Sequence, residues 1–330
     1  MNAVSPRKLA YVAAPLLVVL AALPYLLPPY QLRLVTEAVI FSLYAVSYNL
    51  LLGYAGLLSF GHAMFFGVGA FSTAVAFNHI SGLSCLAAVG LATLGSIVVG
   101  LVVGLLLLRV KGTPFALLTL AFNALFLAIG VKWHTVTGGD DGLSVTPPAI
   151  NLGLGVLDPS NGPDFYFLTL AILGGALLFC WRFTRTAMGH SVLLLRENEE
   201  RMRFLGYNTN VTRLILFVFT GALAGLAGSF YTLQNAFVSL DAVSIDMTTK
   251  VLLMTFLGGT GAFLGPVLGA FFYTYVQDFL SNLTDNWPLI MGVIFIVMVL
   301  YAPGGLAGLC QDLAARFGRA KAVDTAEEGS

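Results

Sequence analysis

The sequence predicts an all-α polytopic membrane protein, and three observations lead to that class. Of its 330 residues, 58% are hydrophobic and only 10% are charged, far from the composition of a soluble globular domain. No Lys, Arg, Asp or Glu occurs between Ala38 and Leu108. Charge gathers instead in one long stretch, Arg182–Arg213. Because a charge is costly at mid-bilayer, this distribution indicates spans buried in hydrocarbon and joined by polar loops.

Ten apolar stretches follow one another along the chain, and each is a predicted membrane segment. The first is expected to be a retained span, because its prolines and the lack of a small-residue cleavage site argue against a signal peptide. The fifth opens with a proline, which a helix tolerates at its start. The segments are Leu9–Leu27, Leu34–Leu52, Phe60–Asn78, Ser84–Leu108, Pro114–Lys132, Phe165–Trp181, Leu214–Gln234, Lys250–Gly259, Ala262–Leu280 and Trp287–Tyr301.

The seventh segment contains the run GALAGLAGSF, in which small residues recur at a spacing of four. Small side chains at that spacing let two helices approach closely in lipid. Gly221, Gly225 and Gly228 are therefore predicted helix-packing residues.

Positive charge predicts which loops face the cytoplasm. Placing Arg7/Lys8, Arg109/Lys111 and the Arg182–Arg213 stretch inside puts the Asp-bearing loop after Lys132 outside. The basic C-terminal tail returns to the cytoplasm only if residues 250–280 form two membrane segments. The first of these would be a short half-helix. Both termini are then cytoplasmic. The prediction is one transmembrane domain over 1–330: a tail (1–8), a membrane core (9–303) with a periplasmic loop (133–164) and a cytoplasmic segment (182–213), and a second tail (304–330).

Each half of the chain contains a hydrophobic segment interrupted by glycines, Gly53–Gly69 and Gly258–Gly269. Within them, Gly53–His62 and Gly258–Pro266 are expected to be non-helical or kinked. Such paired breaks indicate two related halves and point to a transport pathway. Irregular backbone at membrane depth must lie inside protein or beside water, so both are predicted to flank the route. Alternatively, the glycines only permit tight packing; for His62 a packed, hydrogen-bonded role is favoured. The candidate pathway residues are Gly53, Gly56, Ser59, His62, Gly258, Gly259, Gly261 and Pro266.

The Arg182–Arg213 stretch predicts one short amphipathic helix lying parallel to the membrane. Its apolar stripe would consist of Met188, Val192, Leu195, Met202 and Leu205. Glu197–Arg201 and Glu199–Arg203 are favourable i,i+4 pairs, and Gly206 with Asn208 predicts a helix stop. Since a lipid-binding face would be more purely basic, the mixed charge favours a protein partner.

Other classes of protein are less consistent with the sequence. Glu37, Lys250 and Asp278 are candidate coupling-ion ligands of a secondary transporter, but an interpretation as interfacial residues reaching water is favoured. Ser59 and His62 could form a nucleophile and base, yet no orienting acid is evident. No P-loop motif and no metal site are found, and a net charge of zero makes nucleic acid an unexpected partner.

Five motifs resemble, in the same order, those of permeases of branched-chain amino-acid ABC importers, of the LivM type. Together they extend from residue 49 to residue 309. They are NLLLGYAGLLSFGHAMFFGVGAF (Asn49–Phe71), TGGDDGL (Thr137–Leu143), RENEERMRFLGYNTNVTRLILFVFTGALAGLAGSFY (Arg196–Tyr231), GGTGAFLGPVLGA (Gly258–Ala270) and YAPGGLAGL (Tyr301–Leu309).

The resemblance implies a non-enzymatic permease subunit in the bacterial cytoplasmic (inner) membrane. It would move branched-chain or related amino acids, or alternatively urea or another small amide or acid. The implied partners are a sister permease forming a heterodimer, a periplasmic binding protein and two ATPase subunits, which would hold ATP and Mg. Residues 182–213 would be the coupling segment that docks on the ATPase. The corresponding ATPase-coupling residues are Arg196, Glu197, Asn198, Glu200, Arg201 and Gly206.

Overall fold

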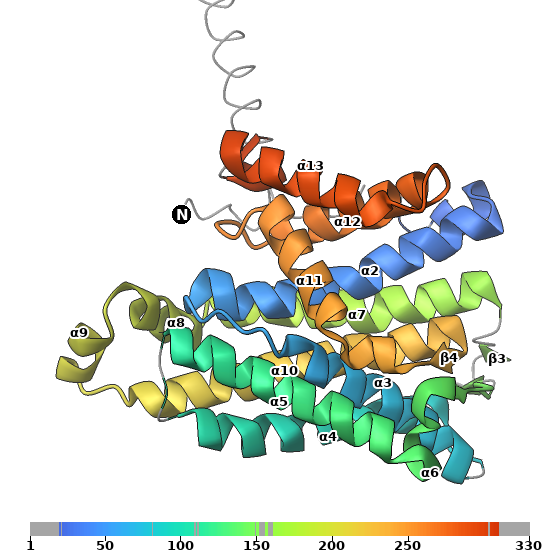
Figure 1. Ribbon diagram of the computed structural model, residues 1–330, viewed down its shortest axis with the longest axis horizontal. Helices are drawn as coiled ribbons and strands as arrows, with labels where there is room; N and C mark the ends of the chain where they lie inside the picture. Colours follow the sequence, from blue (N-terminus) through green and yellow to red (C-terminus); the bar gives the residue numbers. More distant parts are fainter. Residues whose placement is uncertain are drawn as a thin grey trace, which may run out of the picture.

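The computed structural model describes residues 20–309 except 21, 81, 109, 111, 149, 152–155, 158–160 and 303. It is mostly helical, and its long helices lie side by side with α8 and α9 at one end and α6, β3 and β4 at the other (Figure 1). The described helices are α2 (Pro29–Asn49), α3 (His62–His79), α4 (Cys85–Leu107), α5 (Thr113–Lys132), α6 (His134–Thr137), α7 (Gly162–Thr184), α8 (Ala187–Glu197), α9 (Glu199–Phe204), α10 (Thr209–Asn235), α11 (Ile245–Gly258), α12 (Gly265–Ser281) and α13 (Trp287–Tyr301).

Each membrane segment predicted from Leu34 onward coincides with one of these helices. Five helices in the described ranges are long and apolar enough to cross a membrane: α2 with its continuation to Tyr54, α4, α5, α7 and α10. Most of the predicted first span, the basic tails, Arg109 and Lys111 lie outside the described residues.

Short strands and 3₁₀ turns modify the all-α expectation, but only in the connections. β1 (Leu143–Ser144) pairs antiparallel with β4 (Phe237–Val238), and β2 (Ile150–Asn151) pairs with β3 (Val156–Leu157). The remaining short elements are the 3₁₀ turns η2 (Gly139–Asp141) and η3 (Leu240–Val243). Since each strand has only two residues, these pairs fasten loops together and form no sheet layer.

Helix α2 is the centre of the bundle. In the span Pro29–Tyr54, 94% of the most apolar 18-residue window is buried, against 33% for α4 and 28% for α5. Helices α7, α10, α11 and α12 all pack against α2. Many apolar side chains of α4 and α5 therefore face outward, toward lipid or another subunit, while most of those on α2 face protein.

Small residues allow α10 to pack closely on α3 and α4. A Cβ added to Gly228 would lie 1.9 Å from the Phe66 carbonyl oxygen, and one added to Gly225 would lie 2.0 Å from Ser96 Oγ. A Cβ on Gly221 would lie 3.0 Å from the Phe65 ring. The close approach also brings hydroxyls of α10 to carbonyls of α3, as between Thr232 Oγ1 and Ala70 O at 3.1 Å.

Candidate functional site

The first predicted break is present between α2 and α3. Helix α2 continues as a π-helix, η1 (Leu50–Tyr54), and the chain leaves helical geometry at Gly56, whose φ is +69°. The Leu57 amide still donates to Leu51 O at 2.9 Å, and α3 begins only at His62. A left-handed φ favours glycine, so the sequence requires Gly56 at this turn.

His62 is fully buried beside this break. Its Nε2 lies 2.9 Å from Ser47 Oγ, and its ring stacks on Tyr44 with centroids 5.6 Å apart. The Tyr48 hydroxyl donates to the Ser59 carbonyl at 3.0 Å. Among the described residues, no hydrogen bond joins Ser59 to His62: Ser59 Oγ accepts from the Gly61 amide, and His62 Nδ1 has no partner. The geometry fits the packed role for His62 and offers no nucleophile–base pair.

The second predicted break separates α11 from α12. Helix α11 ends at Gly258, and Gly259 has a φ of +101°. A Cβ on Gly259 would lie 2.2 Å from the Gly304 carbonyl oxygen, so the chain after α13 closes over this turn. Gly261 is exposed, with nothing within 4 Å of an added Cβ. Pro266 lies in the first turn of α12, where a helix tolerates proline, and so marks the start of that helix.

The two breaks meet in space although about 200 residues separate them. A Cβ on Gly53 would lie 2.7 Å from the Thr260 carbonyl oxygen, and Asn49 Nδ2 lies 3.5 Å from Ala262 O. Thr255 Oγ1 donates to Ala45 O at 3.3 Å. The fold therefore joins both irregular segments into one region against α2.

The coupling segment is two helices, so the expectation of a single one is wrong. Asn198 has extended backbone angles (φ −161°, ψ 101°) between α8 and α9, and its Oδ1 accepts from the Arg201 amide at 2.9 Å. An asparagine that caps a new helix ends the previous one. Glu197 and Arg201 consequently belong to different helices, while the predicted Glu199–Arg203 ion pair is confirmed at 3.0 Å.

The apolar stripe is also shorter than predicted. Val192, Leu195 and Met202 are buried, but Leu205 is 62% exposed because α9 ends at Phe204 and the chain turns at Gly206 (φ +85°). Phe204 is 90% exposed and Tyr207 48%. We call these three exposed side chains, Phe204, Leu205 and Tyr207, the α9 tip. Sequence periodicity had assigned Leu205 to the buried face and had not singled out the other two.

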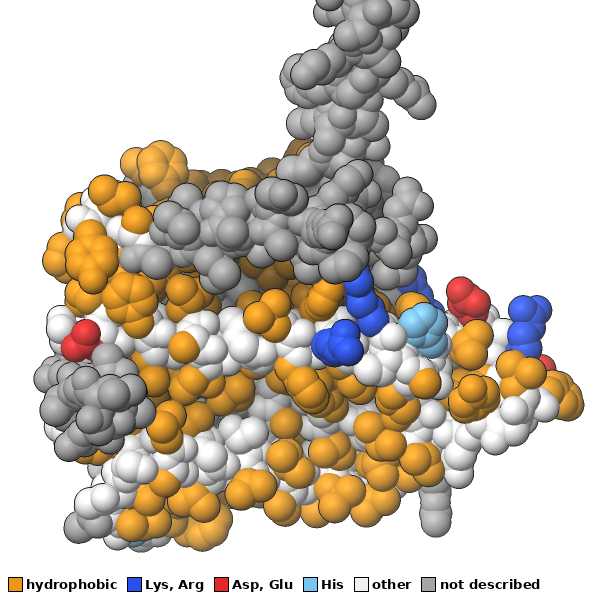
Figure 2. All heavy atoms as spheres, turned by 180° about the vertical axis from the view of Figure 1, so that it is seen from behind, with side chains coloured by type: hydrophobic (Ala, Val, Ile, Leu, Met, Phe, Trp, Pro, Cys, Tyr) orange, Lys and Arg blue, Asp and Glu red, His pale blue; other side chains and the backbone are white. Residues whose placement is uncertain are grey.

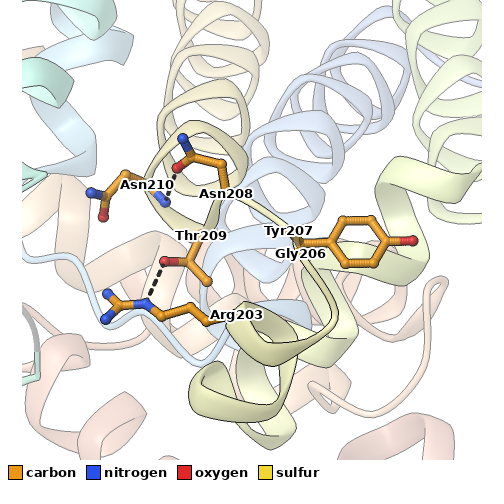
Figure 3. Close-up of a pocket in the computed structure, with 6 residues that line it drawn as sticks. All are labelled: Arg203, Gly206, Tyr207, Asn208, Thr209 and Asn210. Atoms are coloured by element: carbon orange, nitrogen blue, oxygen red, sulfur yellow. Dashed lines mark hydrogen bonds between the residues drawn. The ribbon is translucent and has the colours of Figure 1, made fainter.

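A buried ion pair fastens α9, which leads into the α9 tip, to α10. Glu199 pairs with Arg203 at 3.0 Å and with Arg213 at 3.2 Å, and the Arg213 side chain is only 5% exposed. Arg203 Nε also donates to Thr209 Oγ1 at 3.3 Å (Figure 3). Removing Glu199 would leave Arg213 buried without its anion, which is strongly unfavourable. The Glu199–Arg213 pair therefore fastens α9 to α10, and sequence reasoning missed the contribution of Arg213.

A shallow hollow of about 530 Å³ lies beside the α9 tip. It is lined by Arg203, Gly206, Tyr207, Asn208, Thr209 and Asn210, and the Tyr207 ring points away from the others (Figure 3). The Asn208 side chain accepts from the Asn210 and Val211 amides and so caps α10. The backbone around the hollow is thus held by hydrogen bonds of its own.

Arg196 connects the coupling segment to the first break. Its guanidinium donates to the Gly53 carbonyl in η1, and its Cγ would lie 3.2 Å from a Cβ on Gly56. A cation is favourable at the C-terminal end of a helix, where carbonyls lack amide partners. Glu197, Asn198, Glu200 and Arg201 are exposed, as is the Gly206 turn. Of the six candidate coupling residues, Arg196 is therefore the one bonded to the membrane helices.

Residues 30–302 match the family described as branched-chain amino acid transport system / permease component. The chain belongs to this family. It is 28% identical over 327 residues to a LivM branched-chain amino acid permease protein of Salmonella typhimurium, covering 93% of this chain and 77% of that one. It is 27% identical over 320 residues to LivM of Escherichia coli, covering 91% and 75%.

A second group of relatives carries a different name. The chain is 33% identical over 186 residues to an autoinducer 2 import system permease protein, LsrC, of Klebsiella pneumoniae, covering 54% of this chain and 50% of that one. No solved structure matches the chain.

Membership of this permease family agrees with the membrane-length helices, and the chain is a multi-pass permease of the cytoplasmic (inner) membrane. Figure 2 shows apolar side chains over most of the visible face, with charged ones gathered toward the end that carries α8 and α9. Within the described part of the chain, no group of His, Cys, Asp and Glu is placed to hold a metal ion.

The bond between Arg196 and Gly53 predicts a local effect of substitution. In Arg196→Met, the amides of Gly56 and Leu57 should exchange with deuterium about tenfold faster, because a charged hydrogen bond no longer holds the carbonyl end of η1. The matched control is Arg201→Met, which removes an exposed arginine from the same segment. Equal exchange at these amides in both variants would contradict the bond.

Proposed function

We propose that this chain is a membrane-spanning subunit of an ATP-driven ABC importer that moves branched-chain or related amino acids into the cytoplasm. The main support is similarity to LivM permeases over more than nine-tenths of the chain. The two glycine breaks fall within the matched residues 30–302 and meet at the central helix α2.

The proposed topology has ten membrane segments in two related halves, with both termini and residues 182–213 in the cytoplasm. The basic residues of α8 and α9 support this orientation, because positive loops remain inside. Helix α11, with 14 residues, is too short to cross a bilayer unaided and serves as the half-helix. The loop 133–164 with its exposed Asp140 and Asp141 then faces the periplasm.

The proposed assembly adds a sister permease, two ATPases that hold ATP and Mg, and a periplasmic binding protein. The α9 tip is the proposed ATPase contact: three large exposed side chains on a turn fixed by the Glu199–Arg213 pair form a rigid apolar projection. Exposed Glu197, Glu200 and Arg201 surround it with both signs of charge. An apolar centre with a charged rim is the usual composition of a protein interface.

The proposed pathway runs past the region where the breaks meet. Movement of α8 by a bound ATPase reaches η1 through Arg196, and the Gly53 region contacts Thr260 of the other break. The two irregular segments can therefore shift together. Since packed elements transmit small displacements between discrete arrangements, this contact offers a route from ATP hydrolysis to the pathway.

The substrate class is tested by uptake into vesicles that contain the complete importer with its own binding protein. Leucine, isoleucine or valine should accumulate only when ATP is present inside and the binding protein outside. The similarity to an autoinducer 2 permease makes that compound the informative competitor, with urea as the small-amide alternative. ATP-dependent uptake of either compound without amino-acid uptake would reject the proposed substrate class.

The topology predicts opposite labelling of two exposed positions. In a background without the native cysteines, Asp140→Cys should react with an impermeant maleimide added from the periplasmic side. Glu200→Cys should react only after the membrane is opened, because the Arg-rich segment remains inside. Periplasmic labelling of Glu200→Cys would reverse the proposed orientation.

If the α9 tip contacts the ATPase, shortening one of its side chains should weaken ATPase binding. Phe204→Ser should weaken association with the ATPase subunits about 30-fold, since loss of one central aromatic contact costs about 2 kcal/mol. Trp133→Ser is the matched control, because Trp133 is also exposed but lies at the opposite end of the helices. Copurification at matched expression measures both, and equal affinity would remove the tip from the interface.

A further inference from the structure

Three charged residues that the sequence places far apart come together at the end of the helices away from α8 and α9. Glu37 lies on α2, Lys250 on α11 and Asp278 on α12, and α2 packs against both other helices. The charged neighbours of Glu37 are Lys250, Arg33 and Asp278. The sequence interpretation, interfacial residues reaching water, did not foresee that they are neighbours.

Glu37 lies well inside a membrane-length helix. It is eight residues after Pro29, which at 1.5 Å per residue is about 12 Å along the axis. Its side chain is half-buried, as is that of Lys250. A charge at such depth faces the bundle interior or a water-filled cavity, because hydrocarbon does not solvate it.

Two of the charged residues, Glu37 and Lys250, have no bonding partner in the described part of the chain. Among the described residues, Glu37 and Lys250 make no hydrogen bond and no ion pair. The other two charges do have neutral partners: Arg33 Nη2 donates to Asn235 Oδ1 at 3.0 Å, and the Tyr30 hydroxyl donates to Asp278. One anion and one cation, on facing helices, thus remain available to a ligand.

Unsatisfied polar atoms point to the same region. Gln234 donates to the Arg33 carbonyl at 2.9 Å, while its own Oε1 is buried without a hydrogen-bond partner. Thr274 is 5% exposed, and its Oγ1 is likewise unpartnered. Thr274 lies one turn before Asp278 on the same face of α12. Buried polar atoms usually have partners, so these two side chains, one bonded to Arg33 and one a turn from Asp278, keep hydrogen-bonding capacity that the chain itself does not use.

We propose that Glu37 and Lys250 form an acceptor site for an amino-acid zwitterion, at the mouth of the pathway opposite the coupling segment. The Glu37 carboxylate accepts the α-ammonium group, and the Lys250 ammonium holds the α-carboxylate. A free amino acid carries both charges a few bonds apart, which suits an anion and a cation that do not contact each other. The assignment rests on the proposed function, because urea and other neutral amides carry no charges to pair with Glu37 and Lys250.

The surroundings of the site suit an apolar side chain. One turn further along α2, Phe41 packs against Phe66 and Tyr231, with ring centroids 6.3 and 6.0 Å away. Phe41 is buried and lies on the same face of α2 as Glu37. A branched aliphatic group therefore has an apolar wall beside the charges that hold its backbone groups.

Neutral variants of the complete importer test the site. Glu37→Gln and Lys250→Gln should each lower the rate of leucine uptake about tenfold, because each removes one charge-assisted hydrogen bond to the zwitterion. ATP hydrolysis stimulated by the binding protein should remain. Asp285→Asn and Lys132→Gln are the controls and should transport normally. Wild-type uptake by both Glu37→Gln and Lys250→Gln would overturn the site.

A second test uses NMR of the wild-type complex, so its result does not depend on whether a variant assembles. Lysines of the wild-type complex are reductively methylated with ¹³C, which keeps their charge, and the Lys250 signal is assigned with Lys250→Arg. Leucine should shift the Lys250 methyl resonance and leave that of Lys132 unchanged. No shift at saturating leucine would overturn the site even if uptake is normal, whereas absence of amino-acid uptake by the wild-type importer would reject the proposed function instead.

Discussion

The hydrogen bond from Arg196 to the Gly53 carbonyl joins residues 182–213 to the region where the two glycine breaks meet. A helix that ends inside a membrane protein leaves carbonyls without amide donors, and hydrocarbon supplies none. Here the donor comes from α8, outside the central bundle. The irregular backbone at η1 is thereby satisfied, and the coupling segment becomes attached to the most buried helix of the fold. A displacement of α8 would therefore act directly on the first glycine break.

Charge is distributed in the fold according to what can solvate it. The α8–α9 end carries exposed charges of both signs around an apolar tip, and its one deeply buried arginine, Arg213, is paired with Glu199. At the other end, Glu37 and Lys250 are half-buried and unpaired within the described chain. The buried Glu199–Arg213 pair holds α9 against α10. The unpaired charges of Glu37 and Lys250 would instead be stabilised by a ligand of opposite charge.

Much of the architecture could be read from the sequence, because hydropathy and charge report directly on the cost of placing a group in hydrocarbon. The spans from Leu34 to Tyr301, the short α11 and the two glycine breaks all follow from that cost. The coupling segment was harder to predict. The spacing of its apolar residues suggested one helix, but capping by Asn198 outweighs that periodicity, and the turn at Gly206 exposes Leu205.

The sequence by itself determined that the chain is a helical, polytopic membrane protein, where the backbone is irregular and which family the motifs resemble. Only the tertiary structure decided what those segments touch: that Gly53 lies against Thr260, that His62 bonds Ser47, and that Glu37 has Lys250 as its charged neighbour. The physical reason is that solvation is a property of each residue and its neighbours in the chain. Packing between helices is set by shape and by directional hydrogen bonds, which join residues about 200 positions apart and leave no periodic pattern in the sequence.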